Sequence, residues 1–252
     1  MGLLQAVGIS KHFAGITALS DVSLDVEPGE LVGLIGPNGA GKTTFFNCLF
    51  GILRPDGGRV MFDGADITAL PTFQRARLGF GRTFQRIEVF AGMTVRDHLL
   101  VAERARRRDG SLWKDLLNRG GPSKDEQERA SATLALLKLE AVADRPIESL
   151  SLGIARLVEL GRTLMTEPKL LLLDEPSSGL DRSETREIAE MLRDIQKERG
   201  TAILLVEHDV EMVQSLANRL FVLDFGTLIA SGPTDDVLSN PIVRRAYLGE
   251  TV

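Results

Sequence analysis

Two different hydrophobic patterns along the chain predict two kinds of β-strand. In the first, apolar and polar residues alternate through residues 3–26, and a short apolar run at 60–62 precedes the turn-forming pair Asp63 and Gly64. Alternation with a period of two indicates strands that bury one face only, as antiparallel strands commonly do. We therefore expect an antiparallel β lobe near the start of the chain.

The second pattern consists of unbroken apolar runs. These runs lie at residues 31–35, 170–173, 202–206 and 220–223. Helical periods over 184–199 and 209–217 separate the later runs. Strands that are apolar on both sides are typical of a parallel sheet covered by helices. With 43% apolar residues, the chain is predicted to form an α/β fold with a mostly parallel sheet and one large core.

The middle of the chain has helical periods instead, with a polar break at 120–124. Packing within this region explains its amphipathic face of Leu112, Trp113, Leu116 and Leu117. We therefore expect a single domain over residues 1–252. Its parts would be a core with the antiparallel β lobe over 1–86 and 167–252, and an inserted helical lobe over 87–166.

A glycine-rich loop follows the run 31–35 and precedes an apolar helix. Its sequence, G-x-x-x-x-G-K-T, is that of a P-loop, in which successive backbone N–H groups and the helix dipole converge on phosphate oxygens. We expect Lys42 to lie at the surface and contact the β- and γ-phosphates, and Thr43 to bind Mg²⁺. The predicted nucleotide-binding residues of this P-loop NTPase are Gly36, Pro37, Asn38, Gly39, Ala40, Gly41, Lys42, Thr43 and Thr44.

Two adjacent carboxylates end the run 170–173. Ligands bind at the carboxyl ends of the strands in an open α/β sheet. There Asp174 would hold Mg²⁺, and Glu175 could polarise an attacking water as general base. The alternative is that both acids only cap the next helix. Because a second acid beside a metal ligand suits hydrolysis better than transfer to a bound acceptor, the pair predicts an ATPase.

A second phosphate site is predicted where Ser151 precedes a helical run as its N-cap. A helix N-terminus with exposed amides binds phosphate, and one chain does not need two such sites for one nucleotide. Here the chain resembles the ATP-binding cassette (ABC) family. The family's signature, LSGGQ in its commonest form, contacts the γ-phosphate held by the opposite subunit of a head-to-tail dimer. The resemblance implies this role for Ser151 and Gly153.

The signature departs from its common form in this chain. Leu152 replaces the first glycine, and Ile154 and Ala155 occupy amide-bearing positions. The backbone N–H groups and the Ser151 hydroxyl remain, whereas the hydrogen bonds of the glutamine side chain are lost. Each neutral hydrogen bond contributes about 0.5–1.5 kcal/mol net, so we expect turnover to be slowed rather than abolished.

Four further residues match the ABC family in order. The resemblance implies that Phe13 stacks on adenine and that Gln85 contacts Mg²⁺ and the lytic water and faces the membrane partner. It also implies that Asp181 belongs to a dimer-contact loop and that His208 contacts the γ-phosphate. Taken singly, a phenylalanine is commonly core, a loop glutamine is solvated, and a histidine after a strand is structural. The order of the four around two strong motifs favours the functional interpretation.

Composition and charge exclude some classes of function. The formal net charge of −5 lacks the basic excess of a nucleic-acid-binding protein. Arg104 and the arginines at 106–108 form a basic run that we expect to end a helix, and the single Cys48 is expected to be a small buried residue. No run approaches the roughly 20 apolar residues of a membrane span, and no charged-then-apolar leader opens the sequence. We therefore expect any membrane role to come through a partner.

Short segments narrow the resemblance to one group of transporters. Segments at 46–49, 82–85, 93–95, 99–102 and 245–250 look like the ATPase subunits of branched-chain (hydrophobic) amino acid importers, and the last also resembles ATPases that extract lipopolysaccharide. The resemblance implies two membrane-spanning permeases, a homodimer or a heterodimer with a second ABC ATPase, and indirectly a solute-binding protein. It implies a peripheral position at the cytoplasmic face of the plasma (inner) membrane.

Other interpretations remain open. The cargo could be lipopolysaccharide or a urea or amide, or the chain could be a soluble ABC ATPase. A DNA-repair ATPase inserts long coiled coils between its lobes, but only 64 residues separate Gln85 from Leu150, and a translation ATPase carries two cassettes. A non-hydrolytic module would be expected to lack Glu175 or His208, and both are present. The kinase-like triplet at 224–226 follows no H-R-D loop, so we predict a hairpin turn there.

Overall fold

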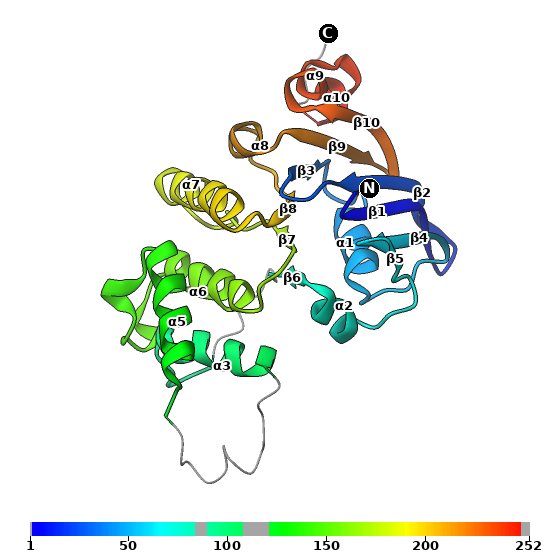
Figure 1. The fold of residues 1–252 in the computed structure, drawn as a ribbon. Helices are drawn as coiled ribbons and strands as arrows, with labels where there is room; N and C mark the ends of the chain where they lie inside the picture. The colour runs from blue at the N-terminus through cyan, green and yellow to red at the C-terminus, as the bar shows by residue number, and fades with distance from the viewer. Residues whose placement is uncertain (1, 84–89, 108–120, 248–252) are drawn as a thin grey trace.

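The structure, a computed structural model, describes residues 2–83, 90–107 and 121–247. Its elements form two β-sheets with helices packed against them (Figure 1). The strands are β1 (Leu4–Phe13), β2 (Ile16–Val26), β3 (Leu31–Ile35), β4 (Gly57–Phe62), β5 (Ala65–Asp66), β6 (Phe80–Arg82), β7 (Leu170–Asp174), β8 (Ala202–Val206), β9 (Arg219–Asp224) and β10 (Thr227–Pro233). The α-helices are α1 (Lys42–Phe50), α2 (Thr72–Leu78), α3 (Val95–Arg107), α5 (Lys124–Leu136), α6 (Leu152–Met165), α7 (Arg182–Arg199), α8 (Val210–Leu216), α9 (Thr234–Ser239) and α10 (Pro241–Tyr247).

The larger sheet has six strands in the order β10-β9-β3-β8-β7-β6. β3 pairs in parallel with β8 and β9, and β7 pairs in parallel with β8 and β6. β10 runs antiparallel to β9 as the second arm of a hairpin. The predicted mostly parallel sheet is confirmed. Its parallel strands bring their carboxyl ends, and the residues that follow them, to one edge.

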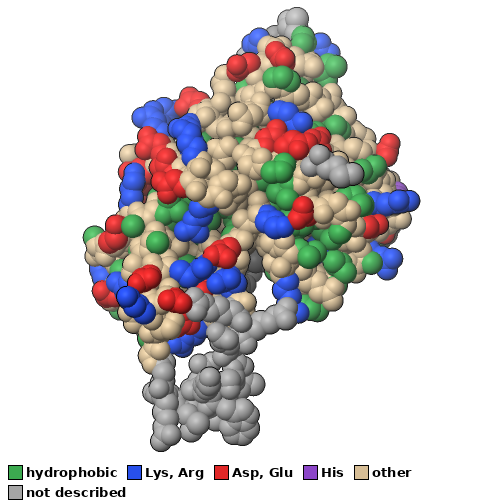
Figure 2. All heavy atoms as spheres, viewed as in Figure 1, with side chains coloured by type: hydrophobic (Ala, Val, Ile, Leu, Met, Phe, Trp, Pro, Cys, Tyr) green, Lys and Arg blue, Asp and Glu red, His purple; other side chains and the backbone are tan. Residues whose placement is uncertain are grey.

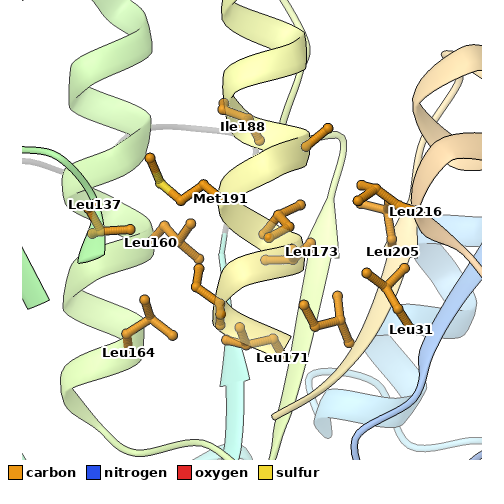
Figure 3. Packing of buried hydrophobic residues seen from close by; sticks show 14 of the residues in the cluster. Leu31, Leu137, Leu160, Leu164, Leu171, Leu173, Ile188, Met191, Leu205 and Leu216 are labelled. Carbon is orange, nitrogen blue, oxygen red and sulfur yellow. The ribbon is translucent and has the colours of Figure 1, made fainter. Parts of the chain in front are cut away.

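Alternate residues of each central strand face opposite sides of this sheet. In β3, Leu31 and Ile35 pack in a cluster with α3, α5, α6, α7 and α8, whereas Val32 and Leu34 pack with α1 and the smaller sheet. Figure 3 shows leucines of the first cluster filling the space between α6, α7 and the strands. The expectation of one large core is therefore wrong. The sheet is covered on both faces and separates two cores.

The smaller sheet has the order β2-β1-β4-β5, and its paired strands are antiparallel. It lies on the same side of the larger sheet as α1, while α3, α5 and α6 contact one another on the other side, at the lower left of Figure 1. The antiparallel β lobe and the helical lobe that carries the signature are thus confirmed. The boundaries at 86/87 and 166/167 stay predictions.

Helix ends follow the capping chemistry of the chain. α7 begins two residues before its predicted start at 184, because the Asp181 carboxylate accepts hydrogen bonds from Ser183 N at 2.7 Å and Glu184 N at 2.9 Å. α5 begins after Ser123, within the predicted polar break. α3 is described as far as Arg107, and the predicted end of this helix in the basic run stays a prediction because residues 108–120 lie outside the described residues. The residues predicted to form an amphipathic face at 112–117 lie outside the described residues.

Charge and apolar surface are unevenly distributed. On the face drawn in Figure 2, charged side chains of both signs cover the helical side, whereas hydrophobic side chains gather on the side of β1, β4 and α2. Exposed hydrophobic residues of these elements include Val7 and Phe73. None of the helices described here is both long enough and apolar enough to cross a membrane.

Candidate functional site

The P-loop joins β3 to α1, and the surrounding backbone requires two of its glycines. Gly36 has a φ of 150°, and a Cβ on it would lie 2.0 Å from the carbonyl oxygen of Leu223. Gly41 has a φ of 101°, and a Cβ there would lie 2.7 Å from the carbonyl oxygen of Ala18. A side chain at either position would displace the chain. The two glycines therefore let the loop pass directly against β9 and β2.

The loop is held in place by the turn between β9 and β10. Gly226 donates its N–H to the carbonyl of Ala40 at 2.9 Å, and its own carbonyl accepts from Ser20 N at 2.8 Å. Residues 224–226 are therefore a hairpin turn, as predicted. The turn supports the P-loop, a role that the sequence did not indicate.

The N-terminus of α1 opens into a cleft of about 410 Å³. Because Gly41 occupies the N-cap position, no capping side chain uses the N–H groups of the first turn, and the positive end of the helix dipole faces the cleft. This arrangement suits a polyphosphate. The lining residues are Ile16, Thr17, Ala18, Asn38, Gly39, Ala40, Gly41, Lys42, Thr43, Thr44, Glu175, Phe225 and Gly226.

Lys42 lies inside the loop and not on the surface. The residue is 6% exposed, and its Nζ donates to the carbonyls of Gly36 at 2.6 Å and Pro37 at 3.0 Å. Burial lowers the pKa of Lys42, and the carboxylates of Glu175 and Asp174 oppose this shift. The prediction of a surface lysine is wrong, because the loop curls around the ammonium. The two carbonyls satisfy two of its three donors, which leaves one for a ligand.

Glu175 and His208 meet at the edge of the cleft. Nε2 of His208 lies 2.6 Å from Oε1 of Glu175. The two residues follow the neighbouring parallel strands β7 and β8, so both emerge at the carboxyl edge of the sheet. Glu175 adopts a φ of 51°, a conformation that costs a non-glycine residue about 1–2 kcal/mol, and its N–H donates to Val206 O at 2.8 Å. The backbone therefore holds the Glu175 carboxylate toward the P-loop.

Asp174, the last residue of β7, is 3% exposed. Its Oδ2 lies 3.3 Å from Nη2 of Arg82, and its buried Oδ1 has no hydrogen-bond partner among the described residues. Burial raises the pKa of Asp174, and Arg82 opposes this shift. A buried carboxylate oxygen without a partner, close enough to Lys42 to affect its pKa, needs a ligand or water. Together with the Thr43 hydroxyl, it fits a hydrated divalent cation.

A buried carboxylate that the sequence analysis missed supports these groups. Glu207 is 2% exposed. Its Oε1 accepts from Ser177 N at 2.8 Å, and its Oε2 accepts from His208 N at 3.0 Å. It therefore links the segment after β7 to the segment after β8, which carry Glu175 and His208. A carboxylate directly after an unbroken apolar run was the available signal, because an acid at that position needs buried donors.

The signature residues lie away from this cleft. Ser151 caps α6 as predicted, with its Oγ accepting from Ile154 N at 3.4 Å. Gly153 packs against α7, where an added Cβ would lie 3.0 Å from Oε1 of Glu184. Ser151, Gly153 and the helix-capping Asp181 are not among the lining residues. Contact with a nucleotide would therefore need the cleft of a second chain, as the resemblance implies.

The contact of His208 with the γ-phosphate stays a prediction, and so do the two remaining predicted contacts. Phe13 ends β1, is 42% exposed and does not line the cleft. Gln85 lies outside the described residues. The cleft's apolar lining comes instead from Ile16 and Phe225, which are 70% and 87% exposed. The sequence analysis missed both, because the position of a hairpin turn beside the P-loop depends on tertiary packing.

Comparison with known proteins identifies the family. The family profile described as "ABC transporter" matches residues 19–178. The chain belongs to the ABC transporter family. A second profile, described as "Branched-chain amino acid ATP-binding cassette transporter", matches residues 227–252 of this ABC protein. The predicted resemblance is confirmed. As an ABC ATPase, the chain binds and hydrolyses ATP.

Similar proteins include transport ATPases with two kinds of cargo in their names. The chain is 40% identical to the high-affinity branched-chain amino acid transport ATP-binding protein LivG of Escherichia coli K12, with 98% of each chain covered. It is 37% identical to BraF of Pseudomonas aeruginosa, which has the same description, with 98% of each covered. It is also 37% identical to the lipopolysaccharide export system ATP-binding protein LptB of Acidithiobacillus ferridurans, covering 98% of this chain and 97% of that one.

Solved structures of cassettes share the fold. A nucleotide-free ATP-binding cassette from an ABC transporter is 34% identical, with a TM-score of 0.85, and the match covers 99% of this chain and 100% of that one. The ADP conformation of the cassette MJ1267 matches with a TM-score of 0.84 at the same identity and coverage. The predicted α/β P-loop fold is thus confirmed.

Proposed function

We propose that this ABC ATPase powers the import of branched-chain amino acids. The observation that carries the cargo assignment is the match of residues 227–252 to the profile of branched-chain amino acid cassettes. In the sequence, this region is separate from the P-loop, the signature and the acidic pair. Its match is therefore independent of the motifs that identify an ABC ATPase in general. The identity to LivG and BraF supports the same cargo.

In this proposal the P-loop cleft holds ATP, with Lys42 and the N–H groups from Gly39 to Thr44 on its phosphates. Thr43, Asp174 and Gln85 would hold Mg²⁺. When bound, the ion supplies charge neutralisation between phosphate oxygens. Phe13 would stack on adenine, a contact of about 1–3 kcal/mol.

Glu175 acts as the general base on the attacking water. His208 holds Oε1 of Glu175 at 2.6 Å, which leaves Oε2 to accept the water's proton. The strained backbone at Glu175 and the support from Glu207 hold this pair against displacement. The proton then sits on a carboxylate already directed at the cleft, so hydrolysis needs no large rearrangement of the chain's own groups.

The same proposal assigns Ser151, Gly153 and Asp181 to the ATP of an opposing chain, either an identical copy or a second ABC ATPase. ATP hydrolysis would drive conformational change in two membrane-spanning permeases, and a solute-binding protein would deliver the amino acid to them. The chain would then sit peripherally at the cytoplasmic face of the plasma (inner) membrane. Its own surface never contacts the cargo in this account.

The test is uptake in cells that lack the gene for this chain. Cells complemented with the wild-type gene should accumulate radiolabelled leucine, isoleucine and valine, and cells complemented with Glu175→Gln should not. Uptake of labelled proline, measured in the same cells, controls for general loss of membrane energy. Unchanged leucine uptake in the deletion strain, with a defect for a different solute, would contradict the cargo assignment.

A second cargo is favoured by one observation. The 37% identity to LptB over nearly the whole of both chains makes lipopolysaccharide export the alternative. A deletion strain with normal amino acid uptake and a defective outer membrane, measured by its permeability to a hydrophobic dye, would support this alternative.

A further inference from the structure

Arg82 is a cation inside the protein, at the end of β6. Its side chain is 5% exposed and faces the Asp174 side chain, which is 2% exposed. Nη2 lies 3.3 Å from Oδ2 of Asp174, and Nη1 donates to Oδ1 of Asn47 at 2.7 Å. Burial of a charge is unfavourable by several kcal/mol unless it is paired and hydrogen-bonded. The guanidinium is therefore placed by these partners and is not a surface group that happens to touch them.

Two aromatic rings fix the guanidinium from the side of α1. Its central carbon lies 5.9 Å from the ring centroid of Phe46 and 5.8 Å from that of Phe50, both within the range of cation–π attraction. Asn47 lies on the same helix. Arg82 is the last residue of β6. Its side chain connects α1, the helix that begins at the P-loop, with Asp174 at the end of β7.

The two oxygens of Asp174 are in different situations. Oδ2 is held by Arg82, whereas Oδ1 is buried without a hydrogen-bond partner among the described residues. We infer that Arg82 is a positioning residue for the divalent cation. It holds Asp174 by Oδ2, so that Oδ1 is the oxygen offered to the ion or to one of its waters. This inference rests on the proposed role of Asp174 as a metal ligand, and it assigns Arg82 a role that the P-loop and acidic motifs do not contain.

A planar, forked cation suits this position better than any other side chain. Arginine can donate to Asn47 and Asp174 at once and lie within cation–π range of two rings. The ammonium of lysine is a single point charge without the planar fork, so we expect it to reproduce these contacts only in part. Partners that orient a metal ligand typically change metal affinity about 10- to 100-fold when they are removed. The structure therefore predicts an effect on metal dependence that exceeds any effect on nucleotide binding itself.

The test compares Arg82→Gln with a matched control, Arg75→Gln. Arg75 is also buried, and its Nη1 donates to the carbonyls of Cys48 at 2.8 Å and Leu49 at 2.6 Å on the same helix α1. Both variants remove a buried guanidinium beside α1, but only Arg82 reaches Asp174. Each full-length protein is titrated with a fluorescent ATP analogue in EDTA and at increasing Mg²⁺. Mn²⁺ binding in the presence of ATP is followed by electron paramagnetic resonance.

Arg82→Gln should raise the half-saturating concentrations of Mg²⁺ and Mn²⁺ about tenfold or more, with metal-free ATP affinity within about twofold of wild type. Arg75→Gln should leave metal dependence unchanged, even where it lowers thermal stability. If Arg82→Gln does not fold, Arg82→Lys serves instead, with a smaller shift in the same direction. Metal dependence equal to wild type in a folded Arg82 variant, or an equal shift in Arg75→Gln, would overturn the inference. Wild-type protein that bound no ATP would instead refute the proposed function.

Discussion

The support that Glu207 gives to the catalytic pair leads to a quantitative prediction for Glu207→Gln. The substitution keeps the size of the side chain but replaces one acceptor oxygen by an NH₂ group. In the wild type both oxygens accept backbone N–H groups, from Ser177 at 2.8 Å and from His208 at 3.0 Å. A glutamine can accept only one of them, because its NH₂ group meets the other N–H as donor against donor.

The expected loss of stability follows from the number of hydrogen bonds that glutamine cannot make. One hydrogen bond to a charged group, worth about 1.5–3 kcal/mol, is lost, and a buried N–H is left without its acceptor. We expect Glu207→Gln to lower the free energy of unfolding by about 2 kcal/mol. For a chain of this length that corresponds to a fall in Tm of about 4–8 °C. If displacement of Glu175 and His208 raises the activation free energy of hydrolysis by a comparable amount, the rate of ATP hydrolysis falls at least about tenfold.

Thermal and urea unfolding of the purified chain measure the first effect, and the ATPase rate of the assembled transporter measures the second. Glu190→Gln, at an exposed position of α7, removes the same charge without the buried contacts and should change neither. A Glu207→Gln protein with wild-type Tm and wild-type ATPase rate would refute the reasoning that this carboxylate holds the two loops together.

Three further predictions follow from the described geometry. Gly36→Ala should abolish ATP binding and lower Tm strongly, since the added Cβ would lie 2.0 Å from the carbonyl oxygen of Leu223. Gly64→Ala is the control, because an added Cβ there meets nothing within 4 Å. It should lower the free energy of unfolding by only about 1–2 kcal/mol through its positive φ, and equal Tm values for the Gly36→Ala and Gly64→Ala proteins would contradict this prediction. Burial raises the pKa of the Cys48 thiol to about 11, so only about 0.1% of the thiol is ionised at pH 8. Iodoacetamide should therefore label Cys48 in urea but not in the native protein, and rapid labelling of the native protein would contradict its burial. Ser151→Arg should leave ATP binding intact and abolish hydrolysis in the assembled transporter, whereas normal hydrolysis would show that the start of α6 does not complete the site.

The motifs and the strand pattern predicted most of the fold because they are local properties. The apolar runs indicated four central strands of the larger sheet. The P-loop, Asp174 and Glu175 could be placed because they lie at the ends of these strands. Ser151 was predicted as an N-cap for the same reason, since capping depends on the next few residues. The contact between Glu175 and His208 was not predicted, because it joins residues 33 positions apart in the sequence.

The rest depends on packing between distant segments. The two cores arise because the small sheet covers one face of the large one, which no local period specifies. Lys42 is buried because the loop closes around its ammonium, and Arg82 reaches Asp174 across 92 positions of sequence. Phe225 lines the cleft because the hairpin at 224–226 is bonded to Ala40. In each case the residue type was visible in the sequence, but its partner was not.

The claim at the centre of this account is that Glu175 is the general base of an ATP site formed by this chain. Its most direct test is the fate of bound ATP in Glu175→Gln, measured by trapping γ-labelled ATP on the assembled transporter with Mg²⁺ and separating ATP from released phosphate. We predict that the variant retains ATP with wild-type affinity and that the trapped nucleotide is recovered uncleaved. Release of phosphate at the wild-type rate would contradict the assignment of Glu175 and with it the mechanism proposed for this cleft.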